Sequence, residues 1–325
     1  MASKGRTSSD FSQGPDARLA VAGSQLFIDV VSVEAVAALE KGGVRSILLK
    51  GPSLARWLYP EPTSRSYSDC DLLVSVGELE GAASVLGDLG FERESFREIE
   101  GDRPLVAHPW IRPRDGATVD LHYGIPGINA PASELWEVLI DATEPMELRG
   151  GRVTVLGLPA RLMHVVLHAA QHGGGRPVVD LARALEQLPE SLWMEAVEVA
   201  RRLDAIDAFS VGLELLDDGR LLLQKLDLPK SGSVDARLRA GSAPPAAFNI
   251  QWFLSRPSLK EKALLIVRKL FPDAASLRAR SALARRGPAG LVAAYLWRPF
   301  SILIQLGPGF VAWRRARREA EASRR

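Results

Sequence analysis

Two aspartates one residue apart, Asp69 and Asp71, form the pair in this chain whose spacing most suggests chemistry. Alternate side chains of a β-strand point to the same face, so a strand here would place both carboxylates together and Cys70 on the opposite face. Like charges this close are unfavourable unless a cation lies between them, and carboxylate oxygens suit Mg²⁺ or Mn²⁺. Asp120, flanked by apolar residues in another strand-like segment, would add a third carboxylate. We therefore expect Asp69, Asp71 and Asp120 to be catalytic metal ligands, since such a set can hold two ions about 3.5–4 Å apart and stabilise a leaving pyrophosphate.

A glycine turn precedes the aspartates and would complete a metal–nucleotide site. Gly51 allows the backbone to approach a phosphate, and a helix that follows it would present free N–H groups. Ser53 offers a hydroxyl, and Lys50 and Arg65 offer positive charge. We expect these four residues to bind the phosphates of a nucleoside triphosphate (NTP). The plainer interpretation is that the aspartates and Lys50 are solvent-exposed side chains at strand ends and form no site.

Histidines form a second group of candidates. His164, His168 and His172 recur every four residues and so share one helix face. They lack the glutamate or cysteine partners of a zinc site, so we expect them to pack the helical part of the chain against the cleft, with His168 or His172 near a phosphate. His122 follows Asp120 by two residues and is interpreted either as its neighbour in the site or as a buried structural histidine.

The elements that would position these residues change in type along the chain. Apolar alternation and turn residues predict strands at 46–49, 69–74, 91–99, 105–112 and 118–123, with a hairpin turn at 114–116 and helices at 26–39 and 78–89. After residue 159 the spacing becomes helical, with helices predicted at 161–172, 178–188, 192–203, 205–223 and 248–253. The fold class is therefore α/β (α+β), a mixed sheet followed by a helical C-terminal domain.

Composition is that of an ordinary globular protein. The 325 residues are 46% hydrophobic and 25% charged, with a net charge of +2. Cys70 is the single cysteine, which excludes intrachain disulfides and cysteine-rich zinc sites and favours a reducing cytoplasm. The polar run 1–16 lacks the order of a signal peptide. We expect a cytoplasmic protein.

The apolar segment 291–313 and the arginines after it leave two interpretations open. Arg298-Pro299 and Gly307-Pro308-Gly309 interrupt the segment, so we expect no integral membrane association. We expect instead that it closes the helical domain against Val166 or Leu185, with 314–325 as a solvated basic tail. The alternative is a membrane-surface or nucleic-acid element, because Trp297, Phe310 and Trp313 neighbour the arginines; nucleic acid is not the partner we expect.

The motifs together resemble the uncharacterised nucleotidyltransferase family of the DNA polymerase beta superfamily. The residues that carry the resemblance are Leu49-Lys50-Gly51-Pro52-Ser53, Arg65, Ser68 to Val74, Leu89-Gly90-Phe91 and Val119 to His122, with later blocks at 167–172, 180–183, 271–272 and 296–299. The resemblance implies a polymerase-beta-like mixed sheet that transfers a nucleoside monophosphate (NMP) group from an NTP to a hydroxyl or phosphate acceptor, with pyrophosphate release. Superfamily members commonly have Gly-Ser at the turn, so Pro52 leaves open whether Ser53 or a backbone N–H meets the phosphates.

The change of pattern after residue 159 sets the expected domains, and the same carboxylates leave two other functions open. We expect a lead-in at 1–20 that is disordered, a catalytic domain at 21–158, a helical domain at 159–313 and the basic tail at 314–325. A non-catalytic nucleotide-binding or regulatory protein would need the same carboxylates. An Asp-x-Asp glycosyltransferase would need more strand–helix units before its aspartates than the one unit found here. The partners expected are an NTP and an acceptor that the sequence does not identify.

Overall fold

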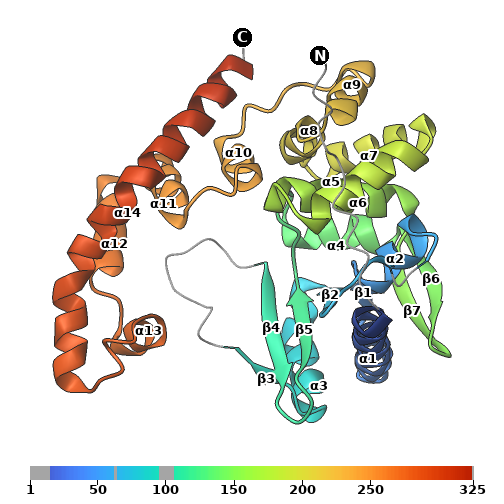
Figure 1. Ribbon diagram of the computed structural model, residues 1–325, viewed down its shortest axis with the longest axis horizontal. Coiled ribbons are helices and arrows are strands. Elements are labelled where there is room, and N and C mark those ends of the chain that lie inside the picture. Colours follow the sequence, from blue (N-terminus) through green and yellow to red (C-terminus); the bar gives the residue numbers. More distant parts are fainter. Residues whose placement is uncertain (1–14, 62–63, 95–105, 324–325) are drawn as a thin grey trace.

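The computed structural model describes residues 15–61, 64–94 and 106–323, and it shows a mixed sheet under a layer of helices with a helical arm beyond (Figure 1). The strands are β1 (Ser46–Leu48), β2 (Cys70–Val74), β3 (Glu92–Arg93), β4 (Ala107–Arg112), β5 (Ala117–His122), β6 (Thr143–Leu148) and β7 (Gly151–Leu156). The helices of the α/β part are α1 (Pro15–Lys41), α2 (Pro52–Leu58), α3 (Leu79–Asp88) and α4 (Ala132–Ile140). Those that follow are α5 (Leu158–His172), α6 (Arg176–Gln187), α7 (Glu190–Arg202), α8 (Ile206–Glu214), α9 (Asp217–Lys225), α10 (Val234–Ala240), α11 (Pro245–Ser255), α12 (Leu259–Leu270), α13 (Ala274–Arg280) and α14 (Pro288–Ser323).

The sheet has the order β3-β4-β5-β2-β1-β7-β6, with β2 paired in parallel to β5 and β1 in parallel to β7. Its two faces bury different side chains because successive residues of a strand alternate. Cys70 and Leu72 of β2 join the core beneath α1 and α3, whereas Leu73 joins the core beneath the helical layer. Asp71 shares the parity of Leu73 and therefore faces the helical layer.

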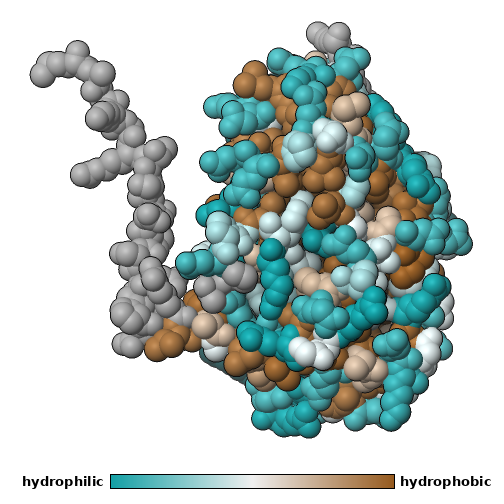
Figure 2. All heavy atoms as spheres, turned by 90° about the vertical axis from the view of Figure 1, so that its right-hand side faces the viewer, coloured by the Kyte–Doolittle hydropathy of each residue, from teal (hydrophilic) through white to brown (hydrophobic). Residues whose placement is uncertain are grey.

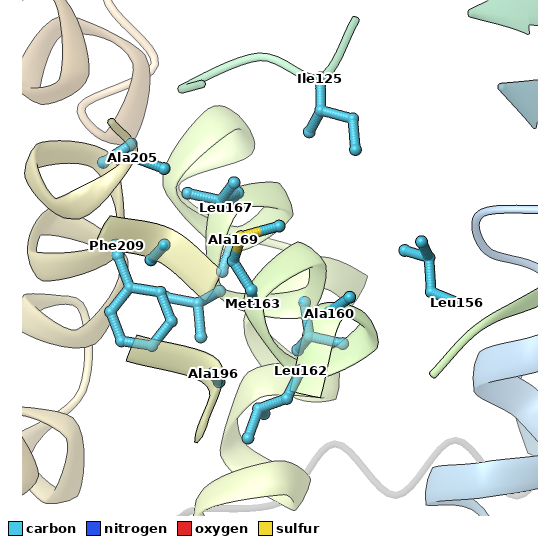
Figure 3. Packing of buried hydrophobic residues seen from close by; sticks show 14 of the residues in the cluster. Ile125, Leu156, Ala160, Leu162, Met163, Leu167, Ala169, Ala196, Ala205 and Phe209 are labelled. Atoms are coloured by element: carbon cyan, nitrogen blue, oxygen red, sulfur yellow. The ribbon is translucent and has the colours of Figure 1, made fainter. Parts of the chain in front are cut away.

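Helix α5 is the centre of the helical layer. Ten of its 15 residues are buried, and it packs on α6, α7, α8 and α10. Figure 3 shows Phe209 of α8 among the side chains of this helix, with Leu162, Met163 and Leu167 labelled. This layer holds α5 over the sheet face that carries Asp71.

Most predicted elements are confirmed, and the boundaries differ in a few places. The hairpin turn at 114–116 is present, with Gly116 at φ 73°. The helix predicted over 205–223 is two helices, α8 and α9, because the chain becomes extended at Leu216. The sequence patterns did not identify α4, the β6–β7 hairpin or the helices α10, α12 and α13. Helix α1 begins at Pro15, so 15–20 of the expected lead-in is helical, whereas 1–14 and the end of the strand predicted at 91–99 lie outside the described residues.

The expectation for 291–313 was wrong in two respects. Helix α14 runs without interruption through Pro299 and Pro308 and continues into the expected basic tail as far as Ser323. It packs against α10 and α11 and more lightly against α12 and α13, and not on Val166 or Leu185. Ala316 and Ala320 are buried, so the basic end is a packed part of the helix.

Two helices in the described part of the chain have the length and composition of a membrane span. They are α1 from Val21 and the whole of α14, but core helices of soluble proteins meet the same criteria. The most apolar stretch of α1 is 39% buried in the molecule, and that of α14 is only 11% buried.

Candidate metal and nucleotide site

Asp71 and Asp120 lie directly opposite each other on neighbouring parallel strands. The β2–β5 register pairs them, and both side chains point to the sheet face beneath the helical layer. Asp71 is only 1% exposed, and Asp120 is half-buried. Ligand-forming atoms of Asp71, Asp120 and His122 all lie within 4.8 Å of one another. We call these three residues the Asp–Asp–His cluster.

His122 is the third member of the cluster, and the sequence left it either as a neighbour of Asp120 in the site or as a structural histidine. It follows Asp120 by two residues in β5, so the strand pleat returns it to the same face. Its Nε2 lies 3.0 Å from Oδ1 of Asp71, which ties the two strands together across the site. Of the two interpretations of His122, the structure agrees with the one that strand parity supports, a neighbour of Asp120 in the site.

Lys50, at the end of β1, supplies the positive charge of the site. Its Nζ lies 2.8 Å from Oδ2 of Asp71 and 3.8 Å from Oδ2 of Asp69. Asp69 precedes the first residue of β2, its side chain is 37% exposed, and it lies outside the Asp–Asp–His cluster. The sequence expected Asp69 and Asp71 to be equivalent, but the structure places Asp69 at the rim and joins it to Asp71 through Lys50.

The charges of the site shift the pKa values of Asp71 and Asp120 in opposite directions. Burial alone would raise the pKa of the Asp71 carboxyl, but Lys50 and His122 hold that pKa well below its usual range. Burial and the charge of Asp71 raise the pKa of Asp120. Burial opposes the charged form of Lys50, yet its carboxylate neighbours raise its pKa above 10.5. Asp71 is therefore a permanent anion, and Asp120 is the more basic carboxylate.

The turn after Lys50 has a backbone conformation that favours glycine. Gly51 has φ 67° and ψ −109°, a conformation that L side chains rarely adopt, and it immediately precedes α2. Ser53 is buried, and its hydroxyl donates to the carbonyl of Leu49 at 3.3 Å. Pro52 at the start of α2 has no N–H. Gly51 therefore shapes the backbone beside Lys50, while the Ser53 hydroxyl donates to a carbonyl that precedes the helix.

Arg65 lies in a different environment from the one expected for a phosphate ligand. Its guanidinium is 4% exposed and donates to both carboxylate oxygens of Asp180 in α6, at 2.8 to 3.1 Å. The Tyr59 hydroxyl donates to Oδ1 of the same carboxylate at 2.6 Å. This Tyr59–Arg65–Asp180 clamp fastens the loop between α2 and β2 to the helical layer, and Arg65 is not brought to the Asp–Asp–His cluster.

The three histidines of α5 run along the roof of the site. The rings of His164 and His168 are 6.1 Å apart and those of His168 and His172 are 4.7 Å apart, centre to centre. Burial first, and then the charge of Lys50, lowers the pKa of each, that of His164 to about 4. They are neutral near pH 7 and do not form a metal cluster among the described residues. The expected packing of α5 over the site agrees with this arrangement.

The Asp–Asp–His cluster has the donor set of a divalent cation site. The cluster offers two carboxylates and an imidazole on neighbouring strands, with ligand atoms within 4.8 Å of one another. The carboxylate oxygens suit Mg²⁺ or Mn²⁺, and the imidazole nitrogen suits a transition metal. The buried, permanently ionised Asp71 needs a positive partner, which Lys50 provides in this structure. The cluster therefore fits a metal, and Lys50 stands where the anionic charge is greatest.

Comparisons with known proteins place this site in a family context. The family described as "Uncharacterised nucleotidyltransferase" matches residues 16–218, which include the whole sheet and every residue of the cluster. A solved structure of an antigenic nucleotidyltransferase-like protein from Paracoccidioides brasiliensis is similar over 56% of this chain and 91% of its own, at 13% identity and a TM-score of 0.34. No curated protein matches the chain in sequence.

Proposed function

We propose that this protein, which belongs to the family of uncharacterised nucleotidyltransferases, transfers an NMP group from an NTP to a hydroxyl or phosphate acceptor and releases pyrophosphate. The observation that carries the proposal is the register of two central parallel strands, which places Asp71 opposite Asp120 with His122 beside them. A carboxylate pair of this kind is what a divalent cation requires when it holds a triphosphate.

The residues of the cluster would have different roles in metal binding. Asp71 and Asp120 would hold the metal, with His122 as a further ligand or as the group that orients Asp71 through their 3.0 Å contact. Asp69, at the rim beside Lys50, is the residue we propose for a second ion. When bound, Mg²⁺ or Mn²⁺ supplies positive charge that stabilises the developing charge on phosphate oxygens.

Two groups of the chain have their own part in the chemistry. Asp120 has a raised pKa, so it is the carboxylate suited to accept the proton of an attacking hydroxyl. The Lys50 ammonium is charged and lies beside Asp71, next to the Gly51 turn. We propose that a bound cation replaces this ammonium beside the carboxylates, and that Lys50 then neutralises a phosphate. Ser53 and Arg65, in contrast, are already engaged with Leu49 and Asp180.

A non-catalytic nucleotide-binding protein is the second function that the same carboxylates support. The family match favours the enzyme, because the matched family is described as nucleotidyltransferases. The family match favours nucleotidyl transfer over glycosyl transfer.

The experiment is to incubate the full chain with α-labelled NTPs, Mg²⁺ or Mn²⁺ and a cell extract as the source of acceptors. We expect the α-label to appear in an acceptor, and Asp71→Asn to abolish it. Asp88→Asn, an exposed carboxylate on α3 beneath the other face of the sheet, is the matched control and should keep full transfer. Binding of NTP without any transfer would instead favour the regulatory alternative.

A further inference from the structure

Helix α14 presents many large apolar side chains to solvent, and all but one of the side chains that it buries, Trp313, are small. The residues that it buries are Gly290, Ala294, Gly309, Trp313, Ala316 and Ala320. Its exposed large side chains are Val292, Leu296, Trp297, Phe300, Leu303, Ile304, Leu306, Phe310 and Val311, each 36 to 69% exposed. A helix that only packs on a soluble domain does the reverse, because large apolar groups gain most from burial.

These exposed side chains form one stripe. At about 100° per residue, Val292, Leu296, Phe300, Leu303 and Phe310 fall within a single sector of the helix, on the side opposite the packed alanines. Figure 1 shows α14 along one flank of the molecule, away from the sheet. On the opposite flank, hydrophilic side chains are spread between the hydrophobic ones (Figure 2). We call the exposed side chains of 292–311 the α14 stripe.

Positive charge continues the α14 stripe at its C-terminal end. Arg314 and Arg318 are exposed and lie in the same sector, and the Arg314 guanidinium is 5.9 Å from the centre of the Phe310 ring. Residues 256–318 contain 14 basic and two acidic residues, whereas the rest of the chain has 27 basic and 37 acidic ones. The region around the stripe is therefore strongly cationic in a chain whose remainder is anionic.

From this pairing of an apolar stripe with a cationic surround, we infer that α14 docks on the surface of an anionic lipid membrane and lies in its interface. An apolar helix face with arginines beside it binds such a surface through apolar burial and attraction to anionic headgroups. The stacked rings of Trp297 and Phe300, 6.2 Å apart, are of the type that favours the headgroup boundary.

By length and composition α14 could cross a membrane, but Arg298 divides its apolar part. Arg298 and Arg314 are separated by 15 uncharged residues, which as a helix reach about 22 Å and so fall short of a hydrocarbon core of about 30 Å. Arg298 Nε donates to the carbonyl of Lys269 at 2.5 Å, which holds this charge against α12. The packed face of α14 is also engaged by α11, so only the stripe is available to lipid.

Vesicle co-sedimentation of the full chain tests this inference. We expect binding to vesicles of phosphatidylcholine and phosphatidylserine in equal parts, and much weaker binding to phosphatidylcholine alone. Phe300→Glu should weaken binding to the mixed vesicles at least tenfold, and the Arg314→Gln and Arg318→Gln changes about fivefold each. The controls are Leu221→Glu on α9, where the leucine is 64% exposed, and Arg201→Gln on α7, and both should bind as the unchanged chain does.

Three results would overturn the inference. The first is no binding to the mixed vesicles, and the second is equal weakening in Phe300→Glu and Leu221→Glu. The third is bound protein that resists extraction with alkaline carbonate, which would indicate a span. Light scattering on the same proteins tests whether a second copy of the chain covers the stripe instead of a membrane. A dimer that Phe300→Glu dissociates, together with no vesicle binding, would assign the stripe to that second copy. Circular dichroism melts establish that each variant is folded.

Discussion

Removal of the Asp180 carboxylate should destabilise the protein far more than removal of a surface carboxylate. Asp180 is 1% exposed and is the acceptor for the Arg65 guanidinium and the Tyr59 hydroxyl. Asp180→Ala leaves the Arg65 charge buried without its partner, which costs about 3–5 kcal/mol. Asp180→Asn keeps an acceptor and should cost less. We expect urea unfolding, followed by circular dichroism, to show this order.

Matched variants separate the clamp from a surface ion pair and from a phosphate-binding role. Glu198→Ala removes the partner of Arg201 on α7, where both side chains are more than half exposed, and should cost less than about 1 kcal/mol. A paired change of Arg65→Met with Asp180→Leu should restore much of the lost stability, since no buried charge is left alone. If Asp180→Ala cost no more than Glu198→Ala while Arg65→Lys weakened NTP binding at unchanged stability, the clamp would be refuted.

Four further predictions concern the site and the helical arm. Asp120→Asn should lower turnover more than NTP binding, because a proton acceptor is lost while Asp71 still binds the cation; equal losses in calorimetry and turnover would contradict this. Lys50→Met should tighten Mn²⁺ binding in the absence of NTP, measured by electron paramagnetic resonance, because an ammonium 2.8 Å from Asp71 is removed. The folded pKa of His164, about 4, lies below the usual 6.5, so the folded state binds fewer protons than the unfolded state between these pH values. The free energy of unfolding should therefore be full above pH 6.5 and fall by on the order of 3 kcal/mol on acidification to pH 4. His164→Gln should reduce this loss, measured by urea unfolding. Deletion of 314–325 should lower the melting temperature, since it removes buried Ala316 and Ala320, and an unchanged melt would show that the end of α14 is not packed.

Strand parity accounts for the part of the site that the sequence predicted well. Asp71, Asp120 and His122 lie within two regular strands, where the pleat fixes the face of each side chain. Asp69 was expected beside Asp71, but β2 begins at Cys70, so the pleat does not govern the residue before it. The pleat therefore accounts for the cluster, whereas Asp69 lies at its rim, where Lys50 joins it to Asp71.

Long-range partners account for the part that the sequence missed. Arg65 has the charge of a phosphate ligand, but its partner Asp180 lies 115 residues away, and no local pattern joins the two. Ser53 likewise has the right hydroxyl, but a helix that begins at Pro52 turns that hydroxyl back onto Leu49.

Helix α14 continues through two residues that usually end a helix. A proline inside a helix costs about 3 kcal/mol, so Pro299 and Pro308 indicated interruptions. A side chain at Gly309 would come within 2.6 Å of Ala246 on α11, so this glycine is the point of close contact between the two helices. Gly309 therefore marks the packing site, and the small residues that α14 buries leave most of its large ones facing outward.

The fate of the two ends of the triphosphate tests nucleotidyl transfer most directly. The full chain would be given Mg²⁺ or Mn²⁺, acceptor extract and one NTP labelled in parallel at the α- or the γ-phosphate. The account predicts that the α-label becomes covalently attached to an acceptor while the γ-label appears as pyrophosphate, and that both signals vanish in Asp71→Asn but persist in Asp88→Asn. Release of the γ-label as inorganic phosphate, its transfer to the acceptor, or undiminished α-label transfer by Asp71→Asn would contradict the proposed reaction.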